Sequence, residues 1–147
     1  MCTVSFIPSK HGIIITSNRD EKSVRQQALA PQVFEMNGKQ LIYPVDTISN
    51  GTWFIVNTIG SVGVLLNGAF EPHNANQPYI ISRGTILPAI FKNDNPVKAL
   101  QQFNFKGIEN CTIVLYQENE LYEFRWDGEN LFCRKLDTTQ SHIYSSV

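Results

Sequence analysis

Short apolar runs of strand length, bounded by turn-forming residues, recur along this 147-residue chain. The first pair spans residues 3–7 and 11–17, and the second spans 52–57 and 61–67. The second pair is rich in Val, Ile and Leu and has a Gly-bearing turn, which predicts a hairpin buried on both faces at the centre of a sheet. Three more strands are predicted at 112–117, 120–126 and 130–136, the last two joined by Asp127-Gly128.

Helical spacing lies between these groups of strands. From Ser82 to Phe91 apolar residues recur at three- and four-residue steps, which predicts a helix that Pro88 shortens or kinks. Asn95 is a good N-cap and Pro96 suits the first helical position, so we expect a second helix there.

The order of these elements predicts the fold class. Strands, helices and strands follow one another, which is typical of a layered α+β protein with mostly antiparallel sheets and helices on an outer face. Residues 21–44 contain only short apolar pieces, and we expect them to form a long loop with short strands. No internal repeat or low-complexity linker separates a second domain, so one domain is expected over residues 1–147.

Composition excludes several classes of partner. The net charge is −1 and no basic stripe is present, which argues against nucleic acid as a partner. No apolar run approaches the roughly 18 to 20 residues of a membrane span. The three cysteines are far apart and odd in number, which argues against a disulfide framework and favours a reducing compartment. We therefore expect a cytoplasmic protein, and the oligomeric state stays open.

The sequence concentrates candidate chemistry at Cys2. If Met1 is removed, Cys2 carries a free amine, so one residue supplies a sulfur nucleophile and a general base. Arg19, brought to Cys2 by the first hairpin, would favour the thiolate, and Asp20 or Glu21 would orient the amine or the guanidinium. The alternative is that residues 18–21 form a solvated, turn-forming loop.

A resemblance favours the first interpretation. Met1-Cys2, the strand 13–15 and the motif Asn18-Arg19-Asp20-Glu21 resemble the start of the NRDE family, which includes the transport-and-Golgi-organisation proteins. The similarity continues over most of the chain, through Gly51-Thr52-Trp53-Phe54 with Asn57, the strand 62–67, and Ser82-Arg83-Gly84.

The resemblance implies an N-terminal nucleophile hydrolase architecture, an αββα-type sandwich. The first residues are also similar to those of bile salt hydrolases and penicillin V acylases, which cleave linear amides. The implied function is an N-terminal cysteine hydrolase that cleaves a non-peptide carbon–nitrogen bond in a small amide, without a cofactor. The alternative is a carrier, because some relatives have been linked to haem or acyl-lipid handling. Family members are usually considerably longer, so we expect this chain to lack a C-terminal part.

An amide hydrolase also needs hydrogen-bond donors for the oxyanion. Asn67 is the candidate, because it ends a predicted central strand, precedes a glycine that leaves backbone N–H groups approachable, and matches an Asn in the bile salt hydrolases. The alternative is a turn-forming Asn-Gly pair, and Asn57 is a weaker candidate for the same task.

Four residues are candidates for binding substrate: Asn18, Glu21, Trp53 and Arg83. Arg83 would bind a carboxylate or phosphate at a helix start, or else pair with an acidic neighbour. Trp53 would line a pocket or fill the core.

Other reactive residue types have less support. The three histidines, His11, His73 and His142, share no ligand spacing, so no metal is assigned. Cys111 and Cys133 lie in apolar, strand-like surroundings and are poor candidates for a nucleophile.

Overall fold

Two antiparallel sheets form the framework of the computed structural model, which describes residues 1–21, 24–72 and 79–147. The smaller sheet has the strand order β10-β1-β2, and the larger has the order β3-β4-β5-β6-β7-β8-β9. The strands are β1 (Thr3–Ser9), β2 (Gly12–Asn18), β3 (Leu29–Met36), β4 (Lys39–Val45), β5 (Phe54–Asn57), β6 (Val62–Asn67), β7 (Cys111–Gln117), β8 (Glu120–Trp126), β9 (Leu131–Leu136) and β10 (His142–Ser145).

Three short helical elements lie between β6 and β7. They are the 3₁₀ turn η1 (Arg83–Thr85), α1 (Ile86–Phe91) and α2 (Pro96–Gln101). The Ser82 side chain caps η1, and the Asn95 side chain accepts a hydrogen bond of 2.9 Å from the Lys98 N–H at the start of α2. Both helices and the shortness of α1 agree with the sequence prediction, since Pro88 cannot extend a regular hydrogen-bond ladder.

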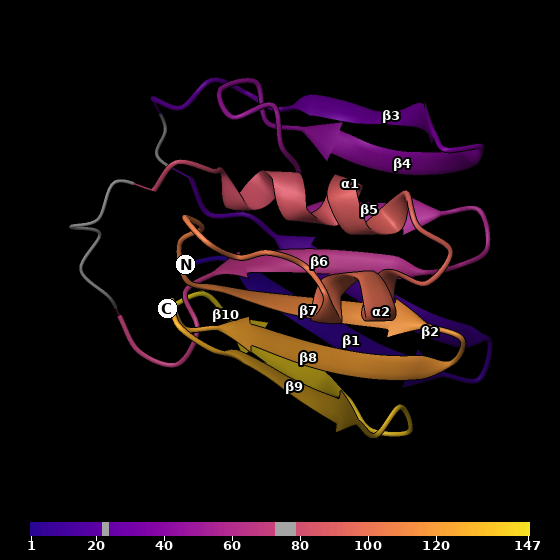
Figure 1. Cartoon of the computed structure of the whole chain (residues 1–147). Helices are drawn as coiled ribbons and strands as arrows, with labels where there is room; N and C mark the ends of the chain where they lie inside the picture. The colour runs from indigo at the N-terminus through magenta and orange to yellow at the C-terminus, as the bar shows by residue number, and fades with distance from the viewer. Residues whose placement is uncertain (22–23, 73–78) are drawn as a thin grey trace.

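The two sheets and the helices stack in layers (Figure 1). α1 and α2 cover one face of the seven-stranded sheet over a core that includes Leu87, Phe91 and Phe124. The three-stranded sheet covers the other face over a second core that includes Phe6 and Leu66. The α+β sandwich with antiparallel sheets predicted from the sequence is therefore confirmed.

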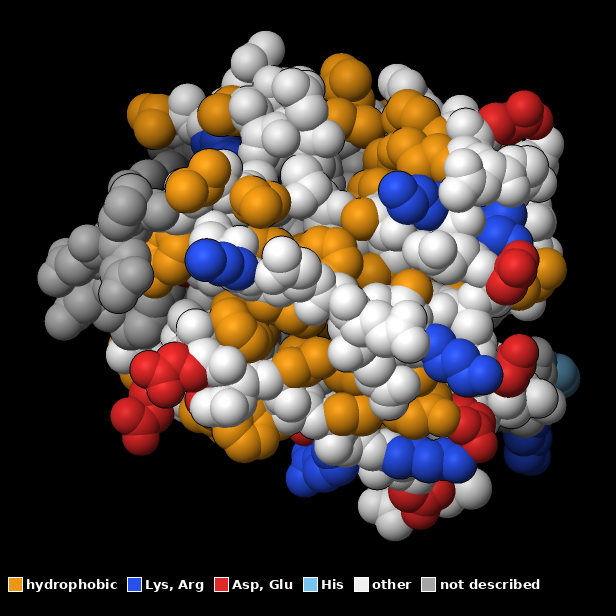
Figure 2. Space-filling model, in the orientation of Figure 1, with side chains coloured by type: hydrophobic (Ala, Val, Ile, Leu, Met, Phe, Trp, Pro, Cys, Tyr) orange, Lys and Arg blue, Asp and Glu red, His pale blue; other side chains and the backbone are white. Residues whose placement is uncertain are grey.

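The described residues form three layers: the helices, the seven-stranded sheet and the three-stranded sheet. Over residues 1–21, 24–72 and 79–147, no helix covers the outer face of the three-stranded sheet, where Ile7, Ile14 and Ile143 are exposed. On the opposite side of the molecule, Figure 2 shows hydrophobic side chains reaching the surface around α1 and the β3–β4 hairpin. Within the same ranges, no helix has the length and apolar character of a membrane-spanning segment.

The interpretation of residues 21–44 as a long loop with short strands was right about the strands but underestimated their length and missed their pairing. β3 has 8 residues and β4 has 7, and they pair through a tight turn at Asn37 and Gly38. Both turn residues have positive φ, 52° and 73°, as a two-residue hairpin turn requires. The Asn37-Gly38 pair is a hairpin-turn signal in the sequence. The polar residues around it made the flanking strands hard to predict. The hairpin places Phe34 and Tyr43 against the helical core.

β6 lies at the middle of the larger sheet, as predicted for the strand 61–67. Its Gly63 lets α1 approach the sheet closely. A Cβ atom at Gly63 would lie 2.7 Å from a ring carbon of Phe91 and 3.0 Å from a methyl carbon of Leu87. Because the Phe91 ring is fully buried, it has little room to move away.

We expect Gly63→Ala to lower the free energy of unfolding by about 1–3 kcal/mol, because the added methyl group overpacks the contact with α1. Urea unfolding measures the change. Phe91→Leu and the double variant complete a mutant cycle, in which the double variant loses less stability than the sum of the single variants. Simple additivity would show that Gly63 and Phe91 are not in this contact.

Candidate functional site

Cys2 lies immediately before β1, the middle strand of the smaller sheet, so neighbours on both sides reach it. Its backbone N–H donates to Ser146 Oγ at 2.9 Å, and the Ser146 N–H donates to the Cys2 carbonyl at 2.9 Å. From the other side, the Asp20 N–H donates to Cys2 Sγ at 3.4 Å. These contacts hold the half-buried Cys2 side chain at the end of the sheet.

The N-terminus lies at the end of the molecule where β6 ends and α1 begins (Figure 1). A cavity of about 240 Å³ opens there beside Cys2. Six residues expected from the sequence to form the site line this cavity: Cys2, Arg19, Glu21, Trp53, Asn67 and Arg83. Segments that lie far apart in the chain thus meet around the sulfur.

Two residues of the Asn18-Arg19-Asp20-Glu21 motif do not line the cavity. Asn18 is exposed at the end of β2, opposite Thr3. Asp20 is also exposed, and its carboxylate pairs with the Met1 ammonium while its backbone contacts Cys2. Of the four motif residues, Arg19 and Glu21 therefore line the cavity, whereas Asn18 and Asp20 lie at the surface.

Arg19 is bound by acidic side chains and is held over an aromatic ring. Its Nη2 lies 2.5 Å from an oxygen of Asp46 and 2.7 Å from an oxygen of Glu21. Its guanidinium carbon lies 4.3 Å from the centroid of the Trp53 ring, a cation–π distance. These contacts fix Arg19 and offset its charge, so its effect on Cys2 is weaker than that of an unpaired arginine.

Asp46 is the centre of this network. Its carboxylate receives bonds from Arg25 at 3.0 and 3.1 Å in addition to the Arg19 contact. Its other partners are the Ser49 backbone N–H at 2.9 Å, the Ser49 hydroxyl at 3.1 Å and the Ile48 backbone N–H at 3.1 Å. The residue is only 4% exposed, so a charged group is buried here with its partners in place.

The pKa of Asp46 reflects these competing influences. Burial alone raises the pKa of the carboxyl group, because it disfavours the charged form. The hydrogen bonds from Ser49, Arg19 and Arg25 outweigh burial and hold the pKa well below its ordinary value. The carboxylate is therefore ionised at neutral pH.

Asn67 reaches the cavity from the end of β6. Its backbone carbonyl accepts a hydrogen bond of 3.1 Å from the Val147 N–H, which ties the end of the chain to β6. The Gly68 N–H itself is not available to an oxyanion, since it donates to the Asn110 carbonyl at 3.0 Å. Gly68 instead permits a close approach, because at φ +80° a Cβ atom would lie 2.8 Å from the Val147 oxygen.

The weaker oxyanion candidate, Asn57, lies elsewhere. It ends β5 at the turn that leads into β6, and its side-chain oxygen accepts the Ser61 N–H at 2.8 Å. Because β5 and β6 are antiparallel, this turn is at the opposite end of the hairpin from Asn67. Asn57 is therefore a turn residue and not part of the site.

Arg83 lines the cavity and pairs with an acidic residue. Its guanidinium lies 2.9 Å from Glu109 and donates to the Asn110 carbonyl at 3.0 Å. The next residue, Gly84, touches a second glycine, since a Cβ atom at Gly51 would lie 2.7 Å from the Gly84 backbone. This close backbone contact joins the start of η1 to the loop before β5.

Sequence reasoning missed three residues of the site: Arg25, Asp46 and Ser146. Arg25 and Asp46 line the cavity, and Ser146 binds the Cys2 backbone. Asp46 directly follows the last residue of β4, and a polar residue at a strand end was the available signal. The arginine partners lie 27 and 21 residues away in sequence, so their pairing depends on the fold.

Cys111, Cys133, His11 and His142 are not among the residues that line this cavity. Burial raises the pKa of the Cys111 thiol to about 12, and partial burial of the thiol also raises the pKa of Cys133, although that residue is exposed on β9. His142 shares a hydrogen bond of 2.7 Å with the Asp137 carbonyl, and His73 is outside the described residues. Over the described ranges, no three His, Cys, Asp or Glu side chains gather in an arrangement that would hold a metal ion.

Comparison with known families identifies the chain's relatives. A family model described as Transport and Golgi organisation 2 matches residues 1–145. No curated protein matches the chain. Because the family match covers nearly the whole sequence, the chain belongs to the Transport and Golgi organisation 2 family, and the resemblance seen in its motifs is confirmed.

Asp46→Asn removes the charge that Arg19 and Arg25 share, and we expect it to lower the free energy of unfolding at pH 7 by about 3 kcal/mol. Because folding depresses the pKa of Asp46, the carboxylate stabilises the fold fully above its ordinary pKa of 3.8. That contribution disappears as the pH falls further toward the folded-state pKa. The difference between wild type and variant should therefore shrink below about pH 4, as measured by urea unfolding at several pH values.

Asp94→Asn is the matched control, because Asp94 also pairs with a cation, Lys39, but is fully exposed. We expect it to leave stability nearly unchanged. An Asp46→Asn variant as stable as wild type at pH 7 would contradict the proposed importance of the network.

Proposed function

We propose that this member of the Transport and Golgi organisation 2 family is an N-terminal cysteine hydrolase that cleaves a linear, non-peptide amide bond. The observation that carries the proposal is the position of Cys2, which lines a cavity together with Arg19 and Asn67. Loss of Met1 would turn the Cys2 backbone nitrogen, 2.9 Å from Ser146 Oγ, into a free α-amine beside the thiol.

The amine would act as the base. It takes the thiol proton, and the resulting thiolate attacks the carbonyl carbon of the amide. The Asp20 N–H, 3.4 Å from Cys2 Sγ, supports the negative sulfur. Ser146, which binds the Cys2 nitrogen, and the Asp20 carboxylate, which now pairs with the Met1 amine, would orient the new amine.

The attack forms a C–S bond and places negative charge on the carbonyl oxygen. The Asn67 side-chain amide, on the wall of the same cavity, would donate to this oxyanion. The ammonium then returns its proton to the departing nitrogen, the C–N bond breaks and a thioester remains. Water attacks the thioester with the amine again as base, which releases the acid and regenerates the thiol.

The cavity favours a small polar substrate. Five of its lining side chains are charged, namely Arg19, Glu21, Arg25, Asp46 and Arg83. Arg83 would bind a substrate carboxylate or phosphate in competition with Glu109. This lining gives less support to the alternative of a carrier for haem or an acyl lipid, which would need more apolar surface.

We also propose a reducing, cytoplasmic location. It is supported by the state of the cysteines, since Cys2, Cys111 and Cys133 are all free.

Cys2→Ala should lower turnover of a responsive amide by about a thousandfold or more, because no other group in the cavity replaces the sulfur. A panel of linear amides with polar acyl or amine parts, assayed for release of the amine, identifies the substrate. Cys133→Ala is the matched control, because Cys133 is a free cysteine outside the cavity, and it should retain full turnover.

Turnover that survives Cys2→Ala would contradict the assignment of the nucleophile. A panel in which no amide is hydrolysed by protein lacking Met1 would contradict the hydrolase itself.

A further inference from the structure

The seven-stranded sheet is wider than the three-stranded sheet that covers one of its faces. Along β9, residues 132–135 are exposed, whereas most of the preceding strand β8 is buried or half-buried. Phe132 and Arg134 alternate with residues that face the helices, so they project on the side of the smaller sheet. A surface groove of about 500 Å³ lies there, separate from the cavity at Cys2.

We propose that this groove binds a small organic anion, a carboxylate or sulfonate joined to an apolar body. Its lining combines an aromatic wall with an excess of positive charge. The lining residues are Phe70, Glu123, Arg125, Phe132, Cys133 and Arg134. The site uses residues that the proposed hydrolase reaction does not.

Two aromatic rings form the apolar wall. Phe70 and Phe132 meet edge to face with centroids 5.1 Å apart, and they remain 53% and 47% exposed. The Arg125 guanidinium carbon lies 5.1 Å from the Phe70 centroid, which fixes one ring against a charged neighbour. Paired rings left half open to solvent offer a surface that an apolar ligand would cover.

The charge at the groove favours an anion. Glu123 is only 6% exposed and pairs with Arg125 at 2.7 Å and Arg134 at 3.2 Å. Two arginines against one glutamate leave one positive charge. Arg125 is held in place by a further bond to the Ala69 carbonyl, whereas the Arg134 side chain is 68% exposed. Arg134 therefore has donors facing solvent that suit a planar carboxylate or a sulfonate.

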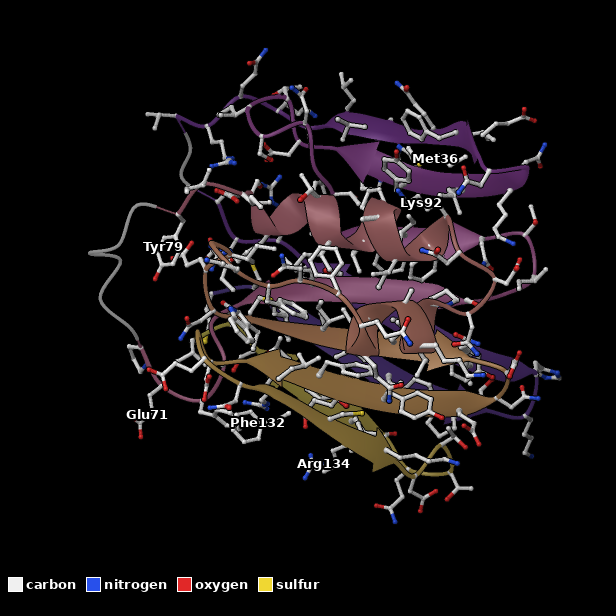
Figure 3. The ribbon with its side chains drawn as sticks, in the orientation of Figure 1. Met36, Glu71, Tyr79, Lys92, Phe132 and Arg134 are labelled. Carbon is white, nitrogen blue, oxygen red and sulfur yellow. The ribbon has the colours of Figure 1, made fainter. Side chains whose placement is uncertain are left out.

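The alternation of side chains along β9 brings the charge of Arg134 and the ring of Phe132 to the same face of the strand. Figure 3 shows Phe132 and Arg134 at the same edge of the molecule, with Glu71 farther off on the connection after β6. Residues two apart on a strand share a face, so a ligand that stacks on Phe132 has its polar group within the range of Arg134. A single small ligand can therefore contact the Phe132 ring with its apolar part and Arg134 with its anionic group.

The charged residues of the groove also act on a buried tyrosine, Tyr144 of β10. The Tyr144 hydroxyl has no hydrogen-bond partner among the described residues, and only 9% of the residue is exposed. Burial raises the pKa of Tyr144 to about 12, and the charges of Glu123, Arg134 and Arg125 all act on it. Tyr144 is not among the residues that line the groove, so its neutral hydroxyl is not assigned a contact with the anion.

The probe is 8-anilinonaphthalene-1-sulfonate, an aromatic sulfonate whose fluorescence rises in apolar surroundings. Titration of the folded protein should give saturable binding at one site. Arg134→Gln and Phe132→Ser should each weaken that binding by about fivefold or more. Lys135→Gln is the matched control, because Lys135 is the next residue on β9 and pairs with Glu120 instead. It should bind the probe like wild type.

N-phenyl-1-naphthylamine, which has the same rings without the sulfonate, tests the role of charge and should bind more weakly than the sulfonate. Equal affinity of the two probes, no saturable binding to wild type, or an Arg134→Gln variant that binds like wild type would overturn the proposal. Urea unfolding of each variant checks that the fold is retained. Cys2→Ala should bind the probe unchanged, so failure of the hydrolase proposal leaves this test intact.

Discussion

The ion pairs of Asp46 are the constraint on which the rest of the site depends. A buried carboxylate is costly unless positive charges and hydrogen-bond donors surround it, and here Arg19, Arg25 and Ser49 supply both. These partners come from the segment after β2 and from the turn after β4. One carboxylate therefore fixes two loops that would otherwise be independent, and it holds Arg19 over Trp53 at the wall of the cavity.

Around this network, backbone contacts decide where Cys2 lies. β1 is the middle strand of its sheet, so segments next to both neighbours hold Cys2, through Ser146 on one side and Asp20 on the other. Gly68 permits the end of the chain to reach Asn67, and Gly51 permits the loop before β5 to touch Gly84. In each case the absence of a Cβ atom on glycine allows two backbone segments near the cavity to approach each other closely.

Local signals in the sequence predicted most of the fold, and long-range pairing could not be predicted in the same way. Asn95 and Pro96 marked α2, and Asp127-Gly128 marked a hairpin, because each signal acts over a few residues. Short strands were expected where β3 and β4 lie, but their pairing through the Asn37-Gly38 turn was missed, since the surrounding residues are polar. At the site, Cys2, Arg19 and Asn67 were singled out by their local chemistry together with the resemblance, whereas the partnership of Asp46 with two arginines exists only in the folded chain.

The central claim is that Cys2 works with its own free amine, and the intact mass of the purified protein tests it most directly. The account predicts a mass lower by one methionine residue, which exposes the amine next to Ser146 Oγ and Asp20. A protein that retains Met1 through expression and purification would have no base on Cys2, and this result would contradict the proposed mechanism.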